Sequence, residues 1–421
     1  MIIGLGFGAI AAISCQESRS ESPPQTTILR VANWEGPSVD AGFLLQERSL
    51  REEFERRHPG VRIKIENIPG EGQYVPKLLM MFVAKRAPDV LQLDASYASV
   101  FIDNDLLLDM TPIIESDTSF ELDRYFRNVV DVARRGDALY AIPLDFTPLV
   151  LFYNKRLFDE ANIPYPNRDW TCDEFLEVAR ALTIDPPGDA SKKQYGLYFR
   201  NLMSLWVPWI WANGGSVLSP DGQHAEGYFN SEQSITAIRF LTDMITQSHV
   251  APSDSEAAAA GVDLFQVGRA AMNVAGHWMI IDYRTANVDF GVTMLPSNTG
   301  RPRTVIYESG LAINRETKQQ TLAWEYVKFM TSAEVQKIRV SSGLAISAQK
   351  DVAEYYASDE QEQTFLEAVE YASGPRGARV EPYAVIEDLG REVVENIVNG
   401  MPVRAAINQA AQLMERELSQ Q

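Results

Sequence analysis

The chain has 421 residues, enough for two or three domains, and its 45% hydrophobic and 23% charged residues are ordinary for a globular protein. Its formal net charge of -19 argues against nucleic acid as a partner, because phosphate recognition needs a basic face, and it disfavours electrostatic attachment to anionic lipid. Neither the 2 cysteines nor the 4 histidines show the spacing of a metal site or a disulfide framework. We therefore expect no metal and no cofactor.

The first residues are typical of an export signal. Residues 1–14 are apolar or small and uncharged, and the run is too short to span a membrane as a mature helix. Ala12-Ile13-Ser14-Cys15 resembles a lipobox, in which cleavage before Cys15 leaves this residue to carry acyl chains; the usual Lys or Arg before the apolar run is missing. The polar residues 15–27 then predict a solvated tether. The alternative is a buried N-terminal strand. The favoured interpretation is an extracytoplasmic, membrane-anchored lipoprotein.

Predicted strands and helices alternate in the next part of the chain, which is typical of an α/β fold. Apolar patterns predict strands at 28–32, 61–65 and from 88–91, with helices at 44–58 and 75–84. Polar and aromatic residues follow two of these strands: Trp34 and Glu35 follow the first, and Asp94 and Ser96 follow the third. Because open α/β sheets bind ligands beyond the carboxyl ends of their strands, we predict that these four side chains bind ligand.

The stretch from Leu139 to Tyr153 predicts a crossing of the chain between two lobes. The apolar run that ends at Pro143 should stop there or lie at a sheet edge, because proline has no N–H for the strand ladder. A polar interruption at 145–147, which includes Asp145, precedes a second apolar run at 149–153, a buried strand. A short helix at 155–161 follows, and a Thr-x-x-Glu capping box opens the next helix.

Further aromatic and acidic candidates come later in the chain. Trp206, Trp209 and Trp211 fall within six residues of a predicted helix, so they cannot share one face, and some must pack inward. Trp278 follows another apolar run, and Glu308 lies in a second predicted crossing, Tyr307–Ile313, where Gly310 offers the backbone freedom of a hinge. Helices are predicted at 230–247 and 322–330 and within 382–418, and strands at 195–198 and 289–296.

The order of these motifs resembles that of bacterial extracellular solute-binding proteins of the maltose-binding type, the receptor subunits of ABC importers. The first crossing carries the most specific part, at Tyr140–Pro143, Tyr153–Lys155 and Trp170–Phe175, although the family's Thr-Trp order is replaced by Asp169-Trp170-Thr171. Further matching segments are Ala87–Val90, Leu106–Asp109, Phe265–Met272, Gly276–Trp278, Gly291–Pro296, Ala323–Phe329 and Gly343. The resemblance covers roughly residues 28–421.

This resemblance implies an α/β protein with the two-lobe periplasmic-binding-protein fold of type II, whose ligand cleft lies between lobes joined by three hinge crossings. We expect residues 28–143 and 310–345 to form the first lobe, and residues 144–309 and 346–421 to form the second. The resemblance also implies a monomer that delivers its ligand to the transmembrane subunits of an ABC permease, with an ATPase behind them.

Binding is favoured over catalysis. The sequence has no Gly-x-Ser-x-Gly elbow and no Gly-x-x-x-x-Gly-Lys phosphate loop, although its carboxylates leave a secreted glycoside hydrolase as a weaker alternative. Sugars offer apolar faces to aromatic rings and hydroxyl groups to carboxylates, so we predict a sugar or oligosaccharide ligand. The predicted ligand-binding residues are Trp34, Glu35, Asp94, Ser96, Asp145, Trp206, Trp209, Trp278 and Glu308. The runner-up is a glycerophosphodiester or polyol-phosphate receptor, for which Arg301 and Arg303 could supply a cationic site.

Overall fold

The computed structural model describes residues 26–34, 41–68, 71–94, 97–188, 192–341, 343, 345–374, 380 and 383–420, with the backbone alone at 41–43 and 71–72. The predicted export signal, Cys15, Glu35 and Ser96 lie outside the described residues. Within the described part, no helix has the length and apolarity needed to cross a membrane.

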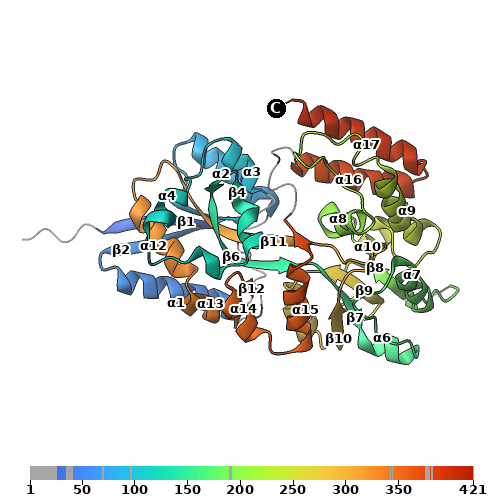
Figure 1. The fold of residues 1–421 in the computed structure, drawn as a ribbon. Helices are drawn as coiled ribbons and strands as arrows, with labels where there is room; N and C mark the ends of the chain where they lie inside the picture. Colours follow the sequence, from blue (N-terminus) through green and yellow to red (C-terminus); the bar gives the residue numbers. More distant parts are fainter. Residues whose placement is uncertain are drawn as a thin grey trace, which may run out of the picture.

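A seven-stranded mixed sheet forms one half of the molecule, which we call the first lobe (Figure 1). Its strand order is β12-β6-β11-β3-β1-β2, and β13 pairs with β11. The strands are β1 (Thr27–Asn33), β2 (Val61–Asn67), β3 (Val90–Asp94), β6 (Ala141–Pro148), β11 (Thr304–Ile313), β12 (Ile346–Ser347) and β13 (Ala372–Ser373). β1 runs parallel to β2 and β3, whereas β11 is antiparallel to β3 and β6. The strands predicted at 28–32, 61–65 and 88–91 are confirmed as β1, β2 and β3.

Helices cover this sheet and fill its connections. They are α1 (Ala41–Arg57), α2 (Glu71–Val83), α3 (Ala98–Asp103), α4 (Thr111–Ser116), α5 (Arg127–Val130), α12 (Gln320–Met330), α13 (Ala333–Val340) and α14 (Lys350–Tyr356). Two 3-10 turns, η1 (Leu122–Arg124) and η2 (Asp131–Ala133), and the small hairpin of β4 (Arg134–Arg135) and β5 (Ala138–Leu139) complete the connections. Their apolar faces enclose a core built around the sheet, with Phe54, Phe101 and Phe146 among its fully buried side chains.

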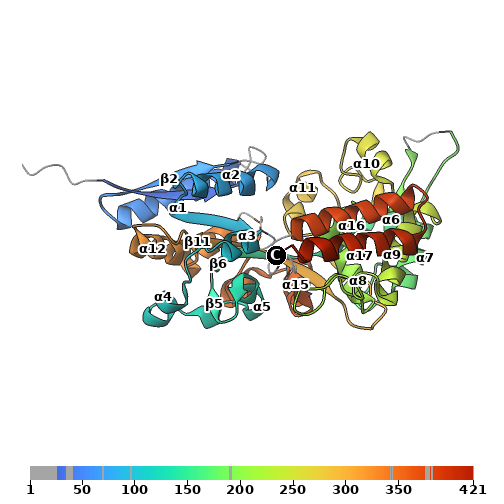
Figure 2. The ribbon, with the colours of Figure 1, turned by 90° about the horizontal axis from the view of Figure 1, so that it is seen from above.

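A four-stranded sheet in the order β10-β7-β9-β8 forms the other half, the second lobe. Its strands are β7 (Val150–Asn154), β8 (Tyr195–Tyr198), β9 (Ala270–Ala275) and β10 (Phe290–Thr293). Its helices are α6 (Lys155–Glu160), α7 (Cys172–Ala181), α8 (Met203–Ala212), α9 (Glu232–Thr246), α10 (Asp254–Ala260), α11 (Met279–Thr285), α16 (Tyr383–Val398) and α17 (Val403–Leu418). Figure 2 shows α16 and α17 side by side along this lobe, and their apolar faces join its core. The predicted capping box is confirmed at Thr171 and Glu174, at the start of α7.

The strands β6 and β11 run between the two halves, and α15 (Glu360–Val369) contacts strands of both sheets (Figure 1). The polar interruption predicted at 145–147 is wrong: β6 continues to Pro148, and the break before β7 falls at Leu149. The reason is that 145–147 pair with β11, whose backbone ladder keeps them extended regardless of side-chain polarity.

The pairing of these two strands has one irregularity. Ser309 pairs with Asp145, whereas Gly310 pairs with Pro143, so the register skips Leu144. Pro143 therefore lies beside a bulge, a position that tolerates its missing N–H. A Cβ on Gly310 would overlap the Glu308 carboxyl group where it now lies, so the glycine leaves room for this side-chain position.

Candidate functional site

The strand register of the first lobe gathers three of the predicted carboxylates. Asp94 at the end of β3 and Asp145 on β6 both pair with Ser309, which lies between them on β11. Glu308 is the residue next to Ser309 on the same strand, so its side chain points to the opposite face of the sheet. Residues far apart in the sequence thus meet on three neighbouring strands of one sheet.

Glu308 is the most deeply buried of these carboxyl groups. It is 2% exposed, and its Oε1 atom has no hydrogen-bond partner among the described residues. Burial, followed by the negative charges of Asp94 and Asp145, raises the pKa of Glu308 well above its usual value. Both effects favour the protonated form, and a protonated carboxyl group can donate a hydrogen bond as well as accept one.

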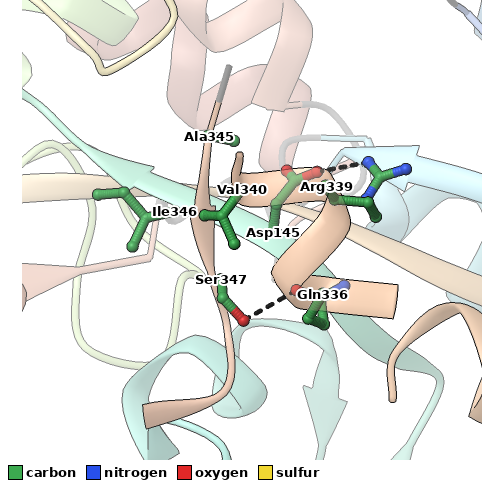
Figure 3. Close-up of a pocket in the computed structure, with 7 residues that line it drawn as sticks. All are labelled: Asp145, Gln336, Arg339, Val340, Ala345, Ile346 and Ser347. Atoms are coloured by element: carbon green, nitrogen blue, oxygen red, sulfur yellow. Dashed lines mark hydrogen bonds and ion pairs between the residues drawn. The ribbon is translucent and has the colours of Figure 1, made fainter. Parts of the chain in front are cut away.

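Asp145 belongs to a buried ion-pair network rather than to an open surface. The Arg339 guanidinium group on α13 lies between Glu47 on α1 and Asp145, with 3.1 Å from its Nη2 to Oδ2 of Asp145. In Figure 3 the Asp145 and Arg339 side chains point toward each other and are joined by a dashed line, among the residues that line a small cavity. The cavity holds about 10 Å³, room for a single water, and is lined by Asp145, Gln336, Arg339, Val340, Ala345, Ile346 and Ser347. A sugar does not fit into this space.

Two of the predicted tryptophans lie in the core of the second lobe. Trp206 is 1% exposed and Trp209 is 5% exposed, and both project from α8. The indole nitrogen of Trp206 donates to Oδ1 of Asn201 at 3.3 Å, and the Trp209 ring packs edge-on against Phe175. The structure therefore gives these two side chains a packing role and offers no open ring face at either of them.

Trp34 and Trp278, by contrast, are half-buried, one in each lobe. Trp34 follows β1, and its ring stands edge-on to Tyr74 of α2, with 5.4 Å between centroids. Trp278 follows β9 and lies over Gly276, where a Cβ would overlap the indole, so only glycine is compatible with this ring position. Both lobes thus carry a partly open aromatic side chain just beyond a strand end.

The family model described as "Bacterial extracellular solute-binding protein" matches residues 45–337. The chain belongs to this family. Among curated relatives of this solute-binding protein, the galactooligosaccharide-binding protein of Bacillus subtilis (strain 168) is 24% identical over 309 residues, 71% of this chain and 69% of the relative. A putative binding protein of Brucella abortus (strain 2308) is 20% identical over 329 residues, 77% of this chain and 76% of the relative.

Solved structures with the same fold confirm the predicted two-lobe architecture. An ABC substrate-binding protein from Listeria monocytogenes, solved in complex with cycloalternan, is 23% identical, covers 94% of this chain and 99% of its own, and gives a TM-score of 0.83. The sugar-binding protein MalE from Xanthomonas citri is 20% identical, covers 94% of this chain and 98% of its own, and gives a TM-score of 0.80. The predicted resemblance to receptors of this type is therefore confirmed.

The structure of this solute-binding protein also shows polar residues that sequence reasoning missed. Beside Trp34, the Tyr74 hydroxyl donates to the carbonyl oxygen of Gln92 at 2.7 Å, and the Gln92 amide donates to Oγ of Ser309 at 2.8 Å. The signal was present, because Gln92 is a polar residue inside an otherwise apolar run, Val90–Leu93. Among the described residues, no group of histidine, cysteine and carboxylate side chains is arranged to hold a metal ion.

Proposed function

We propose that this protein is the extracytoplasmic substrate-binding subunit of an ABC importer and that it binds a sugar or oligosaccharide between its lobes. One observation carries the proposal: each lobe has a half-buried tryptophan beyond a strand end, Trp34 in the first and Trp278 in the second. The family membership supports it, as do the relatives, whose names and titles mention galactooligosaccharide and cycloalternan. Family members are binding proteins rather than enzymes, and the proposal includes no catalytic residue.

The chemistry of the site favours a neutral, hydroxyl-rich ligand. Aromatic faces can stack on sugar rings, and the carboxyl groups of Asp94 and Glu308 can exchange hydrogen bonds with hydroxyl groups. A phosphate group would instead be repelled by the Asp94 carboxylate. The arginines of the runner-up are exposed on the connection before β11, where Arg301 lies over the Tyr371 ring. We therefore prefer the carbohydrate to a glycerophosphodiester or polyol phosphate.

The lobes are best divided by their sheets. We propose that β6 up to Pro148, β11 from Thr304 and β12 belong to the first lobe, a revision of the boundaries that the sequence suggested at 143–144, 309–310 and 345–346. This division follows the strand pairing. Closure of the lobes over a ligand would bend the chain between the two sheets, at Leu149 between β6 and β7.

The cellular setting is also a proposal. We propose that Cys15 is lipidated and that residues 16–27 tether a monomer outside the cytoplasmic membrane, where it delivers ligand to the permease subunits. Two or three acyl chains would hold the protein stably. Labelling cells with a fatty acid should mark the wild type and leave Cys15→Ala unmarked, and label on neither protein would remove the proposal.

A thermal-shift screen of sugars, polyols and glycerophosphodiesters tests the ligand class. A ligand at a hundredfold its Kd stabilises the folded state by about 2.7 kcal/mol, enough to raise the Tm visibly. Trp278→Ala should abolish most of this shift and leave the unliganded Tm nearly unchanged. Tyr165→Ala removes an exposed ring elsewhere in the second lobe and should keep the shift. If Trp278→Ala instead unfolds the protein and spares affinity in the remainder, Trp278 is a core residue and the site is wrong.

A further inference from the structure

Trp278 is attached to both strands that run between the lobes. Thr147 of β6 and Tyr307 of β11 are cross-strand partners. The backbone N–H of His277 donates to Oγ1 of Thr147 at 2.7 Å, and the Trp278 ring stands edge-on to the Tyr307 ring, with 6.1 Å between centroids. We call Thr147, His277, Trp278 and Tyr307 the crossing clamp. It joins the end of β9 to one crossing strand by a hydrogen bond and to the other by a ring contact.

The side chain of His277 anchors the crossing clamp to α15. His277 is buried, its Nε2 lies 2.8 Å from Oε2 of Glu362 on α15, and its ring packs edge-on against Phe365 of the same helix. Its Nδ1 is buried without a hydrogen-bond partner among the described residues. We therefore assign the proton to Nε2, which donates it to the Glu362 carboxylate. The imidazole is held on one side by α15 while its backbone is held on the other by β6.

The second crossing strand is tied to the same lobe. The Tyr307 hydroxyl donates to the carbonyl oxygen of Ser204 on α8 at 2.6 Å. Burial raises the pKa of Tyr307 well above its usual value, so the phenol keeps the proton that it donates. Thr147 and Tyr307, which pair with each other, thus tie both crossing strands to the second lobe. The bulge beside Leu144 lies farther from the second lobe along the same strands.

From this arrangement we infer that Thr147 and His277 are positioning residues, which hold Trp278 in a fixed orientation relative to the crossing strands. The inference rests on the proposed function, in which Trp278 faces the ligand. Its consequence is that two residues that touch no ligand set the affinity, because they keep the indole oriented before the ligand arrives and spare the cost of ordering it on binding.

Substitution of Thr147 tests the inference. Thr147→Val removes the acceptor and keeps the side-chain shape, whereas Thr147→Ser keeps the hydroxyl group. The protein is labelled with fluorotryptophan, and the ¹⁹F resonance of Trp278 is assigned by its loss in Trp278→Phe. Without any ligand, Thr147→Val should shift or broaden the Trp278 resonance alone, and Thr147→Ser should restore it. Affinity for the sugar that gives the largest thermal shift should fall about three- to tenfold in Thr147→Val, the range expected for one lost hydrogen bond.

Glu362 offers a matched pair of variants that spare the clamp itself. Glu362→Gln keeps an oxygen that accepts from Nε2 and should leave the Trp278 resonance in place, whereas Glu362→Leu should move it. A Trp278 resonance unchanged in both Thr147→Val and Glu362→Leu would overturn the inference, as would equal shifts of every tryptophan resonance, which would indicate general loosening. A shifted resonance with unchanged sugar affinity would also overturn it. If no sugar binds but the resonance moves as expected, the proposed ligand fails while the clamp stands, because the signal needs no ligand.

Discussion

One carboxyl group in each lobe, Glu308 in the first and Glu256 in the second, lies in an opposite kind of environment. In the first lobe, Glu308 is buried and its Oε1 has no partner among the described residues, and its pKa is raised. In the second lobe, Glu256 at the start of α10 has a side chain that is 44% exposed and accepts hydrogen bonds from Ser253, Lys193 and Tyr195. Burial opposes its ionisation, but these hydrogen bonds outweigh burial and lower the pKa of Glu256 to about 2.

The difference separates a group that stabilises the fold from one that costs free energy. Glu256 completes a capping box with Ser253, so its bonds contribute to the stability of α10. Glu308 costs free energy where it lies, since a buried polar atom without a partner forfeits its hydrogen bonds to water. A hydroxyl-bearing ligand beside β11 could supply the missing partner. The comparison therefore supports a binding role for Glu308 and a structural role for Glu256.

The largest effect is expected from the buried network of the first lobe. Arg339→Met should lower the free energy of unfolding by about 3 to 5 kcal/mol, because it removes the cation that the buried Glu47 and the half-buried Asp145 share. Urea unfolding at pH 7 measures the change. Arg48→Met, which breaks an exposed pair with Glu52, should change the stability by less than about 1 kcal/mol. Similar losses in the two variants would show that burial does not govern these charges.

This network also marks the limit of what the sequence could predict. β2 and α7 were predicted correctly because their signals are local: alternating apolar residues for β2 and a capping box for α7. Arg339 and Glu47 are 292 residues apart, and no periodicity links them. Asp145 was predicted as a ligand-binding residue, but its cationic partner comes from α13, which only the folded chain brings to β6.

The tryptophans show the same limit for packing. Spacing alone established that Trp206, Trp209 and Trp211 could not share a helix face, but it could not say which of them is buried. The structure buries Trp206 and Trp209 in the core and leaves Trp211 half-buried. That choice depends on the rings of α7 and α9, such as Phe175 and Phe240, which face the same side of α8.

A smaller effect is expected from Glu308. The direction in which its contribution to stability changes with pH tests the contrast with Glu256. Because its pKa in the folded state lies above the ordinary value of 4.5, the folded wild type holds this proton more tightly than the unfolded chain does. Its stability should therefore fall as the pH rises above that value, by up to about 1.4 kcal/mol per pH unit. Glu308→Gln has no proton to lose, so its advantage over the wild type should grow as the pH rises from 4.5 to 8.

Urea unfolding across this pH range measures the difference between the two proteins. Glu354→Gln, at an exposed position, should follow the wild-type profile. Parallel profiles for the wild type and Glu308→Gln would show that the carboxyl group is not held protonated in the folded state.

The smallest effect is expected from Glu256, with the opposite dependence on pH. Its lowered pKa contributes stability that is present above the ordinary value of 4.5 and is lost as the pH falls toward about 2. Because the side chain is 44% exposed, solvent screening reduces this contribution to about 1 kcal/mol. Glutamine can also close a capping box, so Glu256→Gln removes the charge and keeps the cap. The variant should be less stable than the wild type by about 1 kcal/mol at pH 7, and the gap in urea midpoint should close as the pH falls from 4.5 to 2.5. A gap that persists in acid would mean that the hydrogen bonds of Glu256, and not its ionisation, provide the stability.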